Sequence, residues 1–173
     1  MDSTKSYVKI YNVSPAEAED FEFDYDVSCS DLLGELVPDL DNWGGIGWME
    51  LEEYEYNPHS NSMHLTLETK WAAPSHWVQQ ASLGTHYFEN KLITMAAIQK
   101  DETCVTGVAV MDGEILQHKY IFEMDSEEVG KYYNEEEDSH ELDELDNQIW
   151  DSIAKFVNVC EQFYLEKEEE NDN

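Results

Sequence analysis

The chain has 173 residues and carries 40 Asp and Glu against nine basic residues, which gives a formal net charge of -31. All nine basic residues are lysine, and the lack of arginine argues against a nucleic-acid-binding or nucleotide-binding protein, because arginine is the usual bidentate ligand of phosphate. A small domain needs a net charge of only about 2–8 in magnitude to stay soluble, so we expect the excess charge to serve recognition of a partner.

The cysteines and the N-terminal residues indicate a cytoplasmic protein. Cys29, Cys104 and Cys160 are widely spaced and form no CxxC pair, so we expect reduced thiols. Residues 1–13 lack the charged and then apolar pattern of a signal sequence. No apolar run approaches the roughly 18 residues of a membrane span, so we expect no membrane contact.

The first part of the chain predicts two strands and short helical segments. Residues 5–13 favour a strand, and Ser14 with Glu17 makes a capping box that starts a short helix. Residues 21–27 alternate strictly between apolar and acidic side chains, which predicts a strand with an acidic outer face. That face carries Glu22, Asp24 and Asp26. Residues 31–37 predict one or two helical turns before a proline.

The middle of the chain predicts five strands and one helix. Two strands are expected at residues 48–56 and 62–71, joined by a polar turn, and a short helix starts at Ser75 and stops at Gly84. Three further strands are expected at residues 91–98, 103–111 and 114–122. Asp112 and Gly113 predict a two-residue hairpin turn between the last two.

The last third predicts a long amphipathic helix. Residues 126–133 favour a short helix, and a second capping box at residues 138–141 starts a helix of roughly 37 Å. Its apolar positions recur at spacings of three and four, which places them on one stripe. The stripe consists of Leu142, Leu145, Ile149, Ile153, Phe156, Cys160 and Phe163. The sheet or a second copy of the chain must cover it, so a homodimer through this helix is one of two expectations.

These elements predict an α+β fold, with an antiparallel sheet packed against helices and a long C-terminal helix. We expect a core at residues 1–125, a helical acidic extension at 126–166 that packs on the core or on a partner, and a disordered tail at 167–173. Large aromatic side chains bury much apolar area, so we expect the tryptophans to hold this core together. They are Trp43, Trp48, Trp71, Trp77 and Trp150.

Two motifs resemble a known family. Residues 42–48 read Asn-Trp-Gly-Gly-Ile-Gly-Trp, and residues 67–74 read Leu-Glu-Thr-Lys-Trp-Ala-Ala-Pro before the predicted helix. Over residues 40–125 the chain resembles the YubB-type ferredoxin-like domains of phages and conjugative plasmids, which show NWGTKW and a later D-T-x-W-S-P-P-like turn. Here the first motif is one residue longer without its lysine, and only Pro74 remains of the two prolines. The resemblance implies a ferredoxin-like fold and a mobile-element origin, and it carries over no catalytic residue.

Metal and catalytic motifs give no strong signal. The six histidines fall in different predicted elements, without HExxH spacing or a Cys–His cluster. Asp24, Asp26, Ser28 and Glu35 match a calcium-loop register, but the required glycine at its sixth position is Cys29. We therefore expect no metal, no cofactor and no enzymatic activity, with an enzyme of dispersed site as a remaining alternative.

The acidic surface is the feature that points to a function. Residues 10–69 contain fifteen acids and no base, and residues 120–173 contain nineteen acids and three lysines. We expect partner-binding carboxylates in both blocks. They are Glu22, Asp24, Asp26, Asp31, Glu35, Glu50, Glu52, Glu53, Glu55, Glu135, Glu136, Glu137, Asp138, Glu141, Asp143, Glu144 and Asp146.

Ordered carboxylates can stand in for phosphates, and complementary fields accelerate association with a basic partner. We therefore hypothesise an anti-restriction or anti-CRISPR inhibitor from a phage or mobile element that mimics DNA. It would block the basic nucleic-acid-binding groove of a host defence complex in the host cytoplasm, without touching nucleic acid itself. The alternative is an acidic adaptor or chaperone-like module that binds basic proteins without mimicry.

Overall fold

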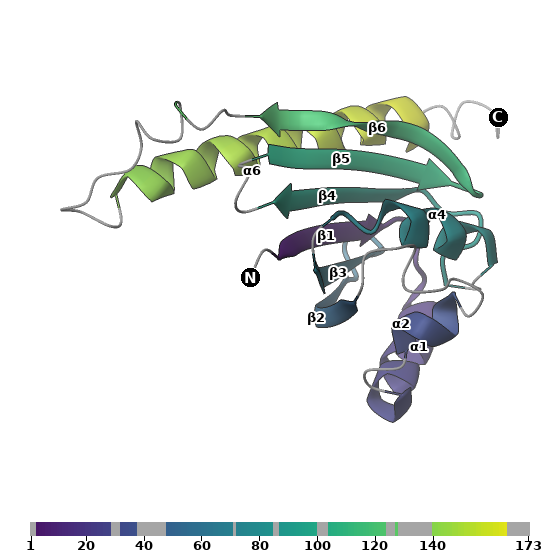
Figure 1. Ribbon diagram of the computed structural model, residues 1–173. Helices are drawn as coiled ribbons and strands as arrows, with labels where there is room; N and C mark the ends of the chain where they lie inside the picture. Colours follow the sequence, from purple (N-terminus) through teal and green to yellow (C-terminus); the bar gives the residue numbers. More distant parts are fainter. Residues whose placement is uncertain are drawn as a thin grey trace.

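The computed structural model describes residues 3–28, 32–37, 48–70, 72–84, 87–99, 104–123, 127 and 140–165. These residues form a six-stranded antiparallel sheet of order β2-β3-β1-β4-β5-β6, with helices on both faces (Figure 1). The predicted α+β class is confirmed. In chain order the elements are β1 (Thr4–Ile10), α1 (Pro15–Ser28), α2 (Leu32–Leu36), β2 (Met49–Asn57), β3 (Ser62–Thr69), α4 (Ser75–Gly84), β4 (Ile93–Gln99), β5 (Cys104–Met111), β6 (Glu114–Glu123), α6 (His140–Cys160) and the π-helical η2 (Glu161–Leu165).

The hairpin between β5 and β6 forms where the sequence predicts it. Asp112 and Gly113 have φ of 50° and 78°, and two successive positive φ values are those of the type I′ turn that matches the twist of paired strands. Helix α4 holds the turn from one side. The Gly113 N–H donates to the Ser82 hydroxyl at 2.8 Å, and the Gln79 side-chain amide donates to the Gly113 carbonyl at 2.9 Å.

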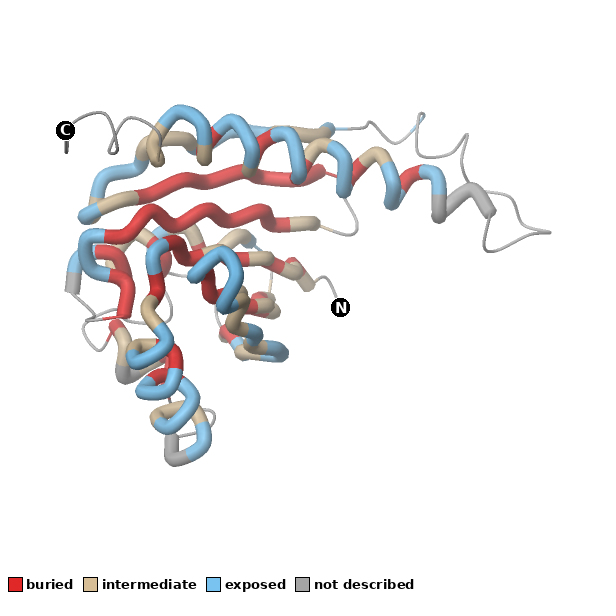
Figure 2. Tube along the Cα trace, turned by 180° about the vertical axis from the view of Figure 1, so that it is seen from behind, coloured by how far each residue is buried: buried red, intermediate tan, exposed pale blue. Residues whose placement is uncertain are grey.

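The first face of the sheet packs against α1, α2 and α4. Alternate residues of the central strands, such as Val8, Leu65 and Met95, are buried there together with Phe21 of α1 and Trp77 of α4. Figure 2 shows buried residues, in red, along the central strands of the sheet. The apolar alternation of the strands thus builds the larger part of the core on one side.

The second face is covered over β4, β5 and β6 by α6. Leu145, Ile149 and Ile153 of the helix form one cluster with Ala96 and Val105 of the sheet. Phe156 and Cys160 form the next cluster along the helix with Ala109. The sheet itself therefore covers the apolar stripe of the long helix, and β4 and β5 are buried on both faces.

The predicted strand at residues 21–27 is wrong, because this segment belongs to helix α1. The capping box forms as expected, with Ser14 Oγ accepting from the Glu17 N–H and Glu17 accepting from the Ser14 N–H, each at 3.2 Å. The helix does not stop early, because Ala18, Phe21 and Tyr25 share a helical face that packs on the core. The alternation over residues 21–27 was too short to decide the period.

The long helix changes its register at its end. The predicted stripe is buried from Leu145 to Cys160, but Phe163 is 57% exposed. Residues Glu161–Leu165 are π-helical, and the wider turn rotates later side chains off the stripe that an α-helix would continue. The expectation that Phe163 is buried with the stripe is therefore wrong.

The tryptophans do not all lie in the core. Trp77 is buried and Trp48 is half-buried. Trp150 is 44% exposed, so its predicted core position is wrong. It directly follows the buried Ile149, and one residue along a helix turns the side chain away from the buried stripe. Several predicted features lie outside the described residues: Trp43, Trp71 and, apart from residue 127, the short helix at 126–133.

We predict that the packing of α6 on the sheet contributes strongly to stability. Ile149→Ala should lower the free energy of unfolding by about 2–5 kcal/mol, because it removes buried methyl groups and leaves a cavity. Val159→Ala on the same helix, at a position that is 53% exposed, should change it by only about 0.5 kcal/mol. Urea unfolding followed by circular dichroism measures both. Equal effects of the two substitutions would contradict this packing.

Candidate functional site

The edge strand β2 displays a row of glutamates. Its residues Met49, Leu51, Tyr54 and Tyr56 pack towards the core. The four exposed residues of the strand are all acidic. These are Glu50, Glu52, Glu53 and Glu55. Because β2 ends the sheet that the described residues form, none of its other strands pairs with the outer edge of β2.

The row is interrupted by a β-bulge that changes the spacing of its glutamates. Leu51 pairs with Leu67 and Glu53 with Thr66, so Glu52 is an extra residue in a bulge. Glu52 lies 3.1 Å from the Lys5 ammonium of β1. Bulges re-aim side chains at sheet edges, and here the bulge places two consecutive glutamates where regular alternation would place one.

Helix α1 brings a second set of carboxylates to β2. Glu22 and Asp26 lie one turn apart on the helix, on the side of Tyr54, whose hydroxyl donates to the Ala18 carbonyl at 3.3 Å. Burial raises the pKa of Tyr54, and the charges of Glu22 and Asp26 raise it further. We call the six residues Glu22, Asp26, Glu50, Glu52, Glu53 and Glu55 the acidic edge.

Asp24 does not join the acidic edge. A helix places it on another side from Glu22 and Asp26, where its carboxylate accepts a hydrogen bond from the Tyr87 hydroxyl. Burial raises the pKa of Tyr87, and the hydrogen bond to Asp24 raises it further. The predicted row of three acids along one strand face is therefore wrong, and its third member ties α1 to the core.

The acidic residues of the C-terminal block are only partly described. Glu144 and Asp146 are exposed on the first turns of α6, where negative side chains interact favourably with the helix dipole. The remaining predicted residues, or their side chains, lie outside the described part of the chain. These are Asp31, Glu35, Glu135, Glu136, Glu137, Asp138, Glu141 and Asp143.

The two acidic blocks approach each other across one face of the sheet. Tyr7 of β1 lies on the second face of the sheet, beside α6. Burial raises the pKa of Tyr7, and the charges of Glu52, Glu53 and Asp146 contribute in the same direction. Carboxylates from β2 and from α6 therefore raise the pKa of the same tyrosine, although they are about ninety positions apart in the chain.

A groove of about 490 Å³ runs along this face of the sheet beside α6. Its sheet side includes Tyr7, His64 and Thr66, and its helix side includes Trp150 and Asn158. The Tyr7 and Trp150 rings meet edge to face with centroids 4.7 Å apart. Burial lowers the pKa of His64, and Lys9 lowers it further, so the imidazole is neutral at pH 7. Sequence reasoning missed this groove, because its residues come together only through strand pairing and the placement of α6.

Three lysines near these surfaces are matched by carboxylates. Lys9 lies 2.9 Å from Glu161, which also accepts a hydrogen bond from the Tyr11 hydroxyl at 2.7 Å. Lys5 pairs with Glu52, and Lys91 pairs with Glu17. The pairs join β1 and the segment before β4 to the helices and to β2. Glu50, Glu53 and Glu55 of β2 are in none of these pairs and are exposed.

No family model, curated protein or solved structure matches the chain. Within the described residues, no three His, Cys, Asp or Glu side chains group closely enough to hold a metal ion. The described helices include none that is both long and apolar enough to cross a membrane.

We predict a pH-dependent contribution from the Lys9–Glu161 pair. Partial burial raises the pKa of Glu161, but hydrogen bonds from Lys9 and Tyr11 outweigh it, so the folded-state pKa lies below the ordinary value of 4.5. The pair therefore stabilises the fold above about pH 4.5, and this stability is lost as the pH falls through the folded-state pKa.

Glu161→Gln should accordingly lower the stability at pH 7, and the difference from the unmodified protein should shrink towards pH 3. Urea unfolding at a series of pH values measures it. Glu144→Gln, which removes one exposed carboxylate from the same helix, controls for the change in net charge. A Glu161→Gln difference that is independent of pH would show that the ion pair is not its source.

Proposed function

We propose that this protein is a phage or mobile-element inhibitor that mimics nucleic acid and blocks the basic nucleic-acid-binding groove of a host restriction or CRISPR-type complex in the cytoplasm. The observation that carries the proposal is the acidic edge, a set of exposed carboxylates on two regular elements. We propose binding as its role, with no catalytic step and no cofactor.

Charge spacing supports mimicry. Alternate side chains along a strand lie about 6.6–6.8 Å apart, and Glu22 and Asp26 are separated by a rise of about 6 Å along α1. One DNA strand carries a phosphate every 3.4 Å or so, so a single row has about half that charge density. The rows of β2 and α1 together, with the doubled glutamates of the bulge, approach the density of one strand.

The rigidity of these rows supports mimicry as well. Tyr56 of β2 donates to the Val13 carbonyl at 2.9 Å, and Tyr54 donates to α1. Phe21 of α1 packs against two tyrosine rings, with centroids 5.1 Å from Tyr54 and 5.4 Å from Tyr87. Carboxylates held on such a frame lose little conformational entropy when a partner binds.

Charged side chains on an edge strand also prevent pairing with another sheet. This role needs only one or two charges on the strand, whereas β2 has four, and α1 adds two beside it. The surplus favours recognition of a basic partner over protection of the edge alone.

We also propose that β1 to β4 form a ferredoxin-like unit related to the YubB-type domains. The chain order β1-α1-α2-β2-β3-α4-β4, in which α2 is an added short helix, and the sheet order β4-β1-β3-β2 support this assignment, with β5 and β6 as an added hairpin. Such an origin in phages or conjugative plasmids suits an inhibitor of host defence. Of the motif residues, Trp48 precedes β2, and Leu67 and Pro74 lie on the path from β3 to α4.

The second candidate function is an acidic adaptor that binds basic proteins without mimicry. It is favoured by the exposed Glu144, Asp146 and Asp151 along α6. Deleting α6 cannot separate the two functions, because the helix buries Ile149, Ile153 and other residues on the sheet. Neutralising charges on intact elements can separate them.

We predict competition with nucleic acid. The protein should displace a fluorescent DNA duplex or guide RNA from host restriction or CRISPR-type complexes, as measured by anisotropy, because both ligands need the same basic groove. Displacement should weaken steeply between about 50 and 200 mM salt, because the attraction is electrostatic. Inhibition that leaves nucleic-acid binding intact, or that does not depend on salt, would argue against mimicry.

We predict that the charges of β2 matter more than the same number elsewhere. Neutralising Glu50, Glu53 and Glu55 to Gln should weaken displacement roughly tenfold to a hundredfold, because close interfacial charge pairs contribute a few kcal/mol. Glu52 is left in place to keep its pair with Lys5.

The matched control neutralises Glu144, Asp146 and Asp151 of α6 and removes the same three charges. It should retain most of the inhibition, and thermal melts of both triple variants check that each is folded. An equal loss in both variants would indicate unspecific charge attraction, and a loss confined to the α6 variant would favour the adaptor.

A further inference from the structure

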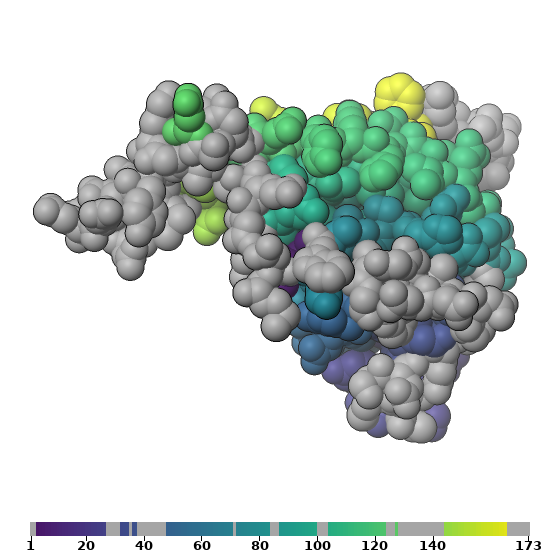
Figure 3. All heavy atoms as spheres, viewed as in Figure 1, coloured from purple at the N-terminus to yellow at the C-terminus, as the bar shows by residue number. Residues whose placement is uncertain are grey.

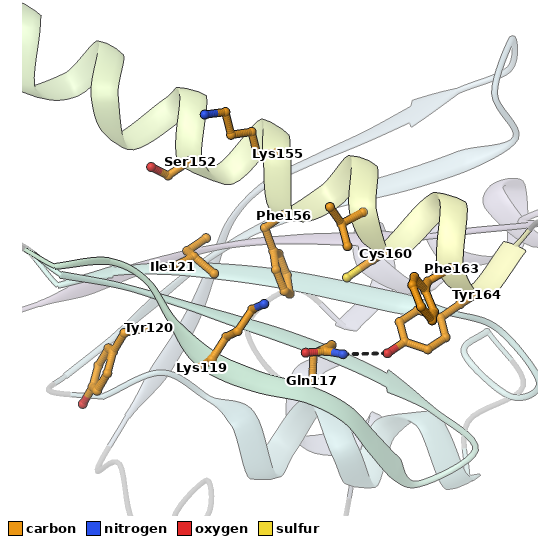
Figure 4. A pocket seen from close by; sticks show the side chains of 11 residues that line it. Gln117, Lys119, Tyr120, Ile121, Ser152, Lys155, Phe156, Cys160, Phe163 and Tyr164 are labelled. Atoms are coloured by element: carbon orange, nitrogen blue, oxygen red, sulfur yellow. Dashed lines mark hydrogen bonds between the residues drawn. The ribbon is translucent and has the colours of Figure 1, made fainter.

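A second pocket lies between β6 and the end of α6, and its character is opposite to that of the acidic edge. It has a volume of about 500 Å³. Phe156 and Cys160 are buried in its floor, and Val159 and Phe163 are 53% and 57% exposed at its rim. Figure 4 shows Phe156, Cys160 and Phe163 on the helix side of the pocket and Ile121 on the side of β6. An apolar surface of this kind remains open to solvent in a chain whose surface is otherwise strongly acidic.

Two lysines flank the pocket. Lys119 comes from β6 and points towards Phe156, and Lys155 comes from α6 (Figure 4). Among the described side chains, neither makes an ion pair, whereas Lys5, Lys9 and Lys91 each do. The pocket thus combines an apolar floor with two lysines that make no ion pair among the described side chains.

The walls of the pocket are held in place by specific contacts. The Gln117 amide donates to the Tyr164 hydroxyl at 2.9 Å and fastens η2 to β6. A side chain at Gly107 would approach Ile121 to 2.8 Å and the Phe156 ring to 3.0 Å, so glycine is needed for these two residues to close the floor. The adjoining π-helix turns Phe163 to the rim, and π-helical turns are frequent at functional sites.

The buried cysteine does not make the pocket a reactive site. Burial raises the pKa of Cys160 to about 11, although Lys119 acts in the opposite direction. The thiol is therefore protonated at neutral pH and is a poor nucleophile. It contributes to the floor as a small apolar group.

We propose that this pocket binds an amphiphile with one carboxylate head group and an apolar tail. The tail lies on Phe156, Val159 and Phe163. The head group pairs with Lys119, whose ammonium lies beside Phe156, and Lys155 adds a second positive charge from α6, although its ammonium points away from Phe156 (Figure 4). The volume falls in the range of about 300–1,000 Å³ that is typical of small-molecule sites. A single head group suits one inward-pointing lysine, whereas an acidic helix of a partner protein would bring further carboxylates against a molecule of charge -31.

The proposal goes beyond the proposed function and does not depend on it. The pocket lies at β6 and α6, at the opposite end of the molecule from α1 and β2 (Figure 1). The space-filling view likewise shows β6 and α1 at opposite ends of one face (Figure 3). A ligand in this pocket would leave the acidic edge uncovered.

The test is titration of the full chain with dodecanoate below its micelle concentration, followed by calorimetry and by amide chemical shifts in NMR spectra. Saturable binding with shifts centred on β6, the end of α6 and η2 is expected. Dodecanol, which has the same tail and no charge, should bind more weakly. The proposal is overturned if dodecanoate does not bind saturably, if the shifts map to another surface, or if dodecanol binds equally well.

Two sets of variants test the head group and the tail separately. Lys119→Gln with Lys155→Gln should weaken dodecanoate binding roughly threefold to tenfold, because each exposed ion pair contributes up to about 1 kcal/mol. The same variant should leave dodecanol binding unchanged. Val159→Ser with Phe163→Ser, at two exposed positions, should weaken the binding of both ligands.

The control variant is Lys5→Gln with Lys70→Gln, which removes two lysines elsewhere and should leave both affinities unchanged. If it weakens dodecanoate binding as much as the pocket variant does, the proposed head-group site is wrong.

Discussion

Burial of the central strands on both faces is the interaction on which the rest of this structure depends. A net charge of -31 produces self-repulsion that opposes a compact state. Strands β4 and β5 contain no acidic residue and are sandwiched between α4 and α6. The hydrophobic gain is concentrated where there is no charge, and the carboxylates are displaced to the edges of the sheet and to the outer sides of helices.

This separation of core and charge gives the acidic edge its order. Tyr54 and Tyr56 of β2 face the core and bind to backbone carbonyls of the N-terminal segment, while their neighbours Glu53 and Glu55 face outward. Each inward aromatic therefore fixes the position of an adjacent carboxylate. A field made of fixed charges discriminates between partners by geometry as well as by sign.

Five of the nine lysines fall into two groups with different roles. Lys5, Lys9 and Lys91 join strands or loops to distant carboxylates, and each pair reduces local repulsion inside the structure. Lys119 and Lys155 instead flank an apolar pocket. The molecule thus has two surfaces of opposite chemistry, the acidic edge at β2 and the lysine-flanked pocket at β6, at the two ends of one sheet.

The sequence alone was sufficient for features that depend on neighbouring residues. The Ser14 capping box, the Asp112-Gly113 turn and a strand over residues 48–56 were predicted and are present. The buried stripe of α6 was predicted as far as Cys160. Hydrogen bonds within a turn and the period of an apolar pattern act over a few residues, so they can be read directly from the chain.

Only the tertiary structure decided features that join distant segments. Residues 21–27 fit a strand by alternation, but no sheet edge receives them, and the core contact of Phe21 makes them a helix. Trp150 is exposed because α6 meets β1 at the boundary of its buried stripe. The groove over Tyr7 forms because β1 lies beside α6. Lys119 and Lys155 line one pocket because β6 lies beside the same helix. Such contacts are set by the packing of the whole chain, and no local pattern encodes them.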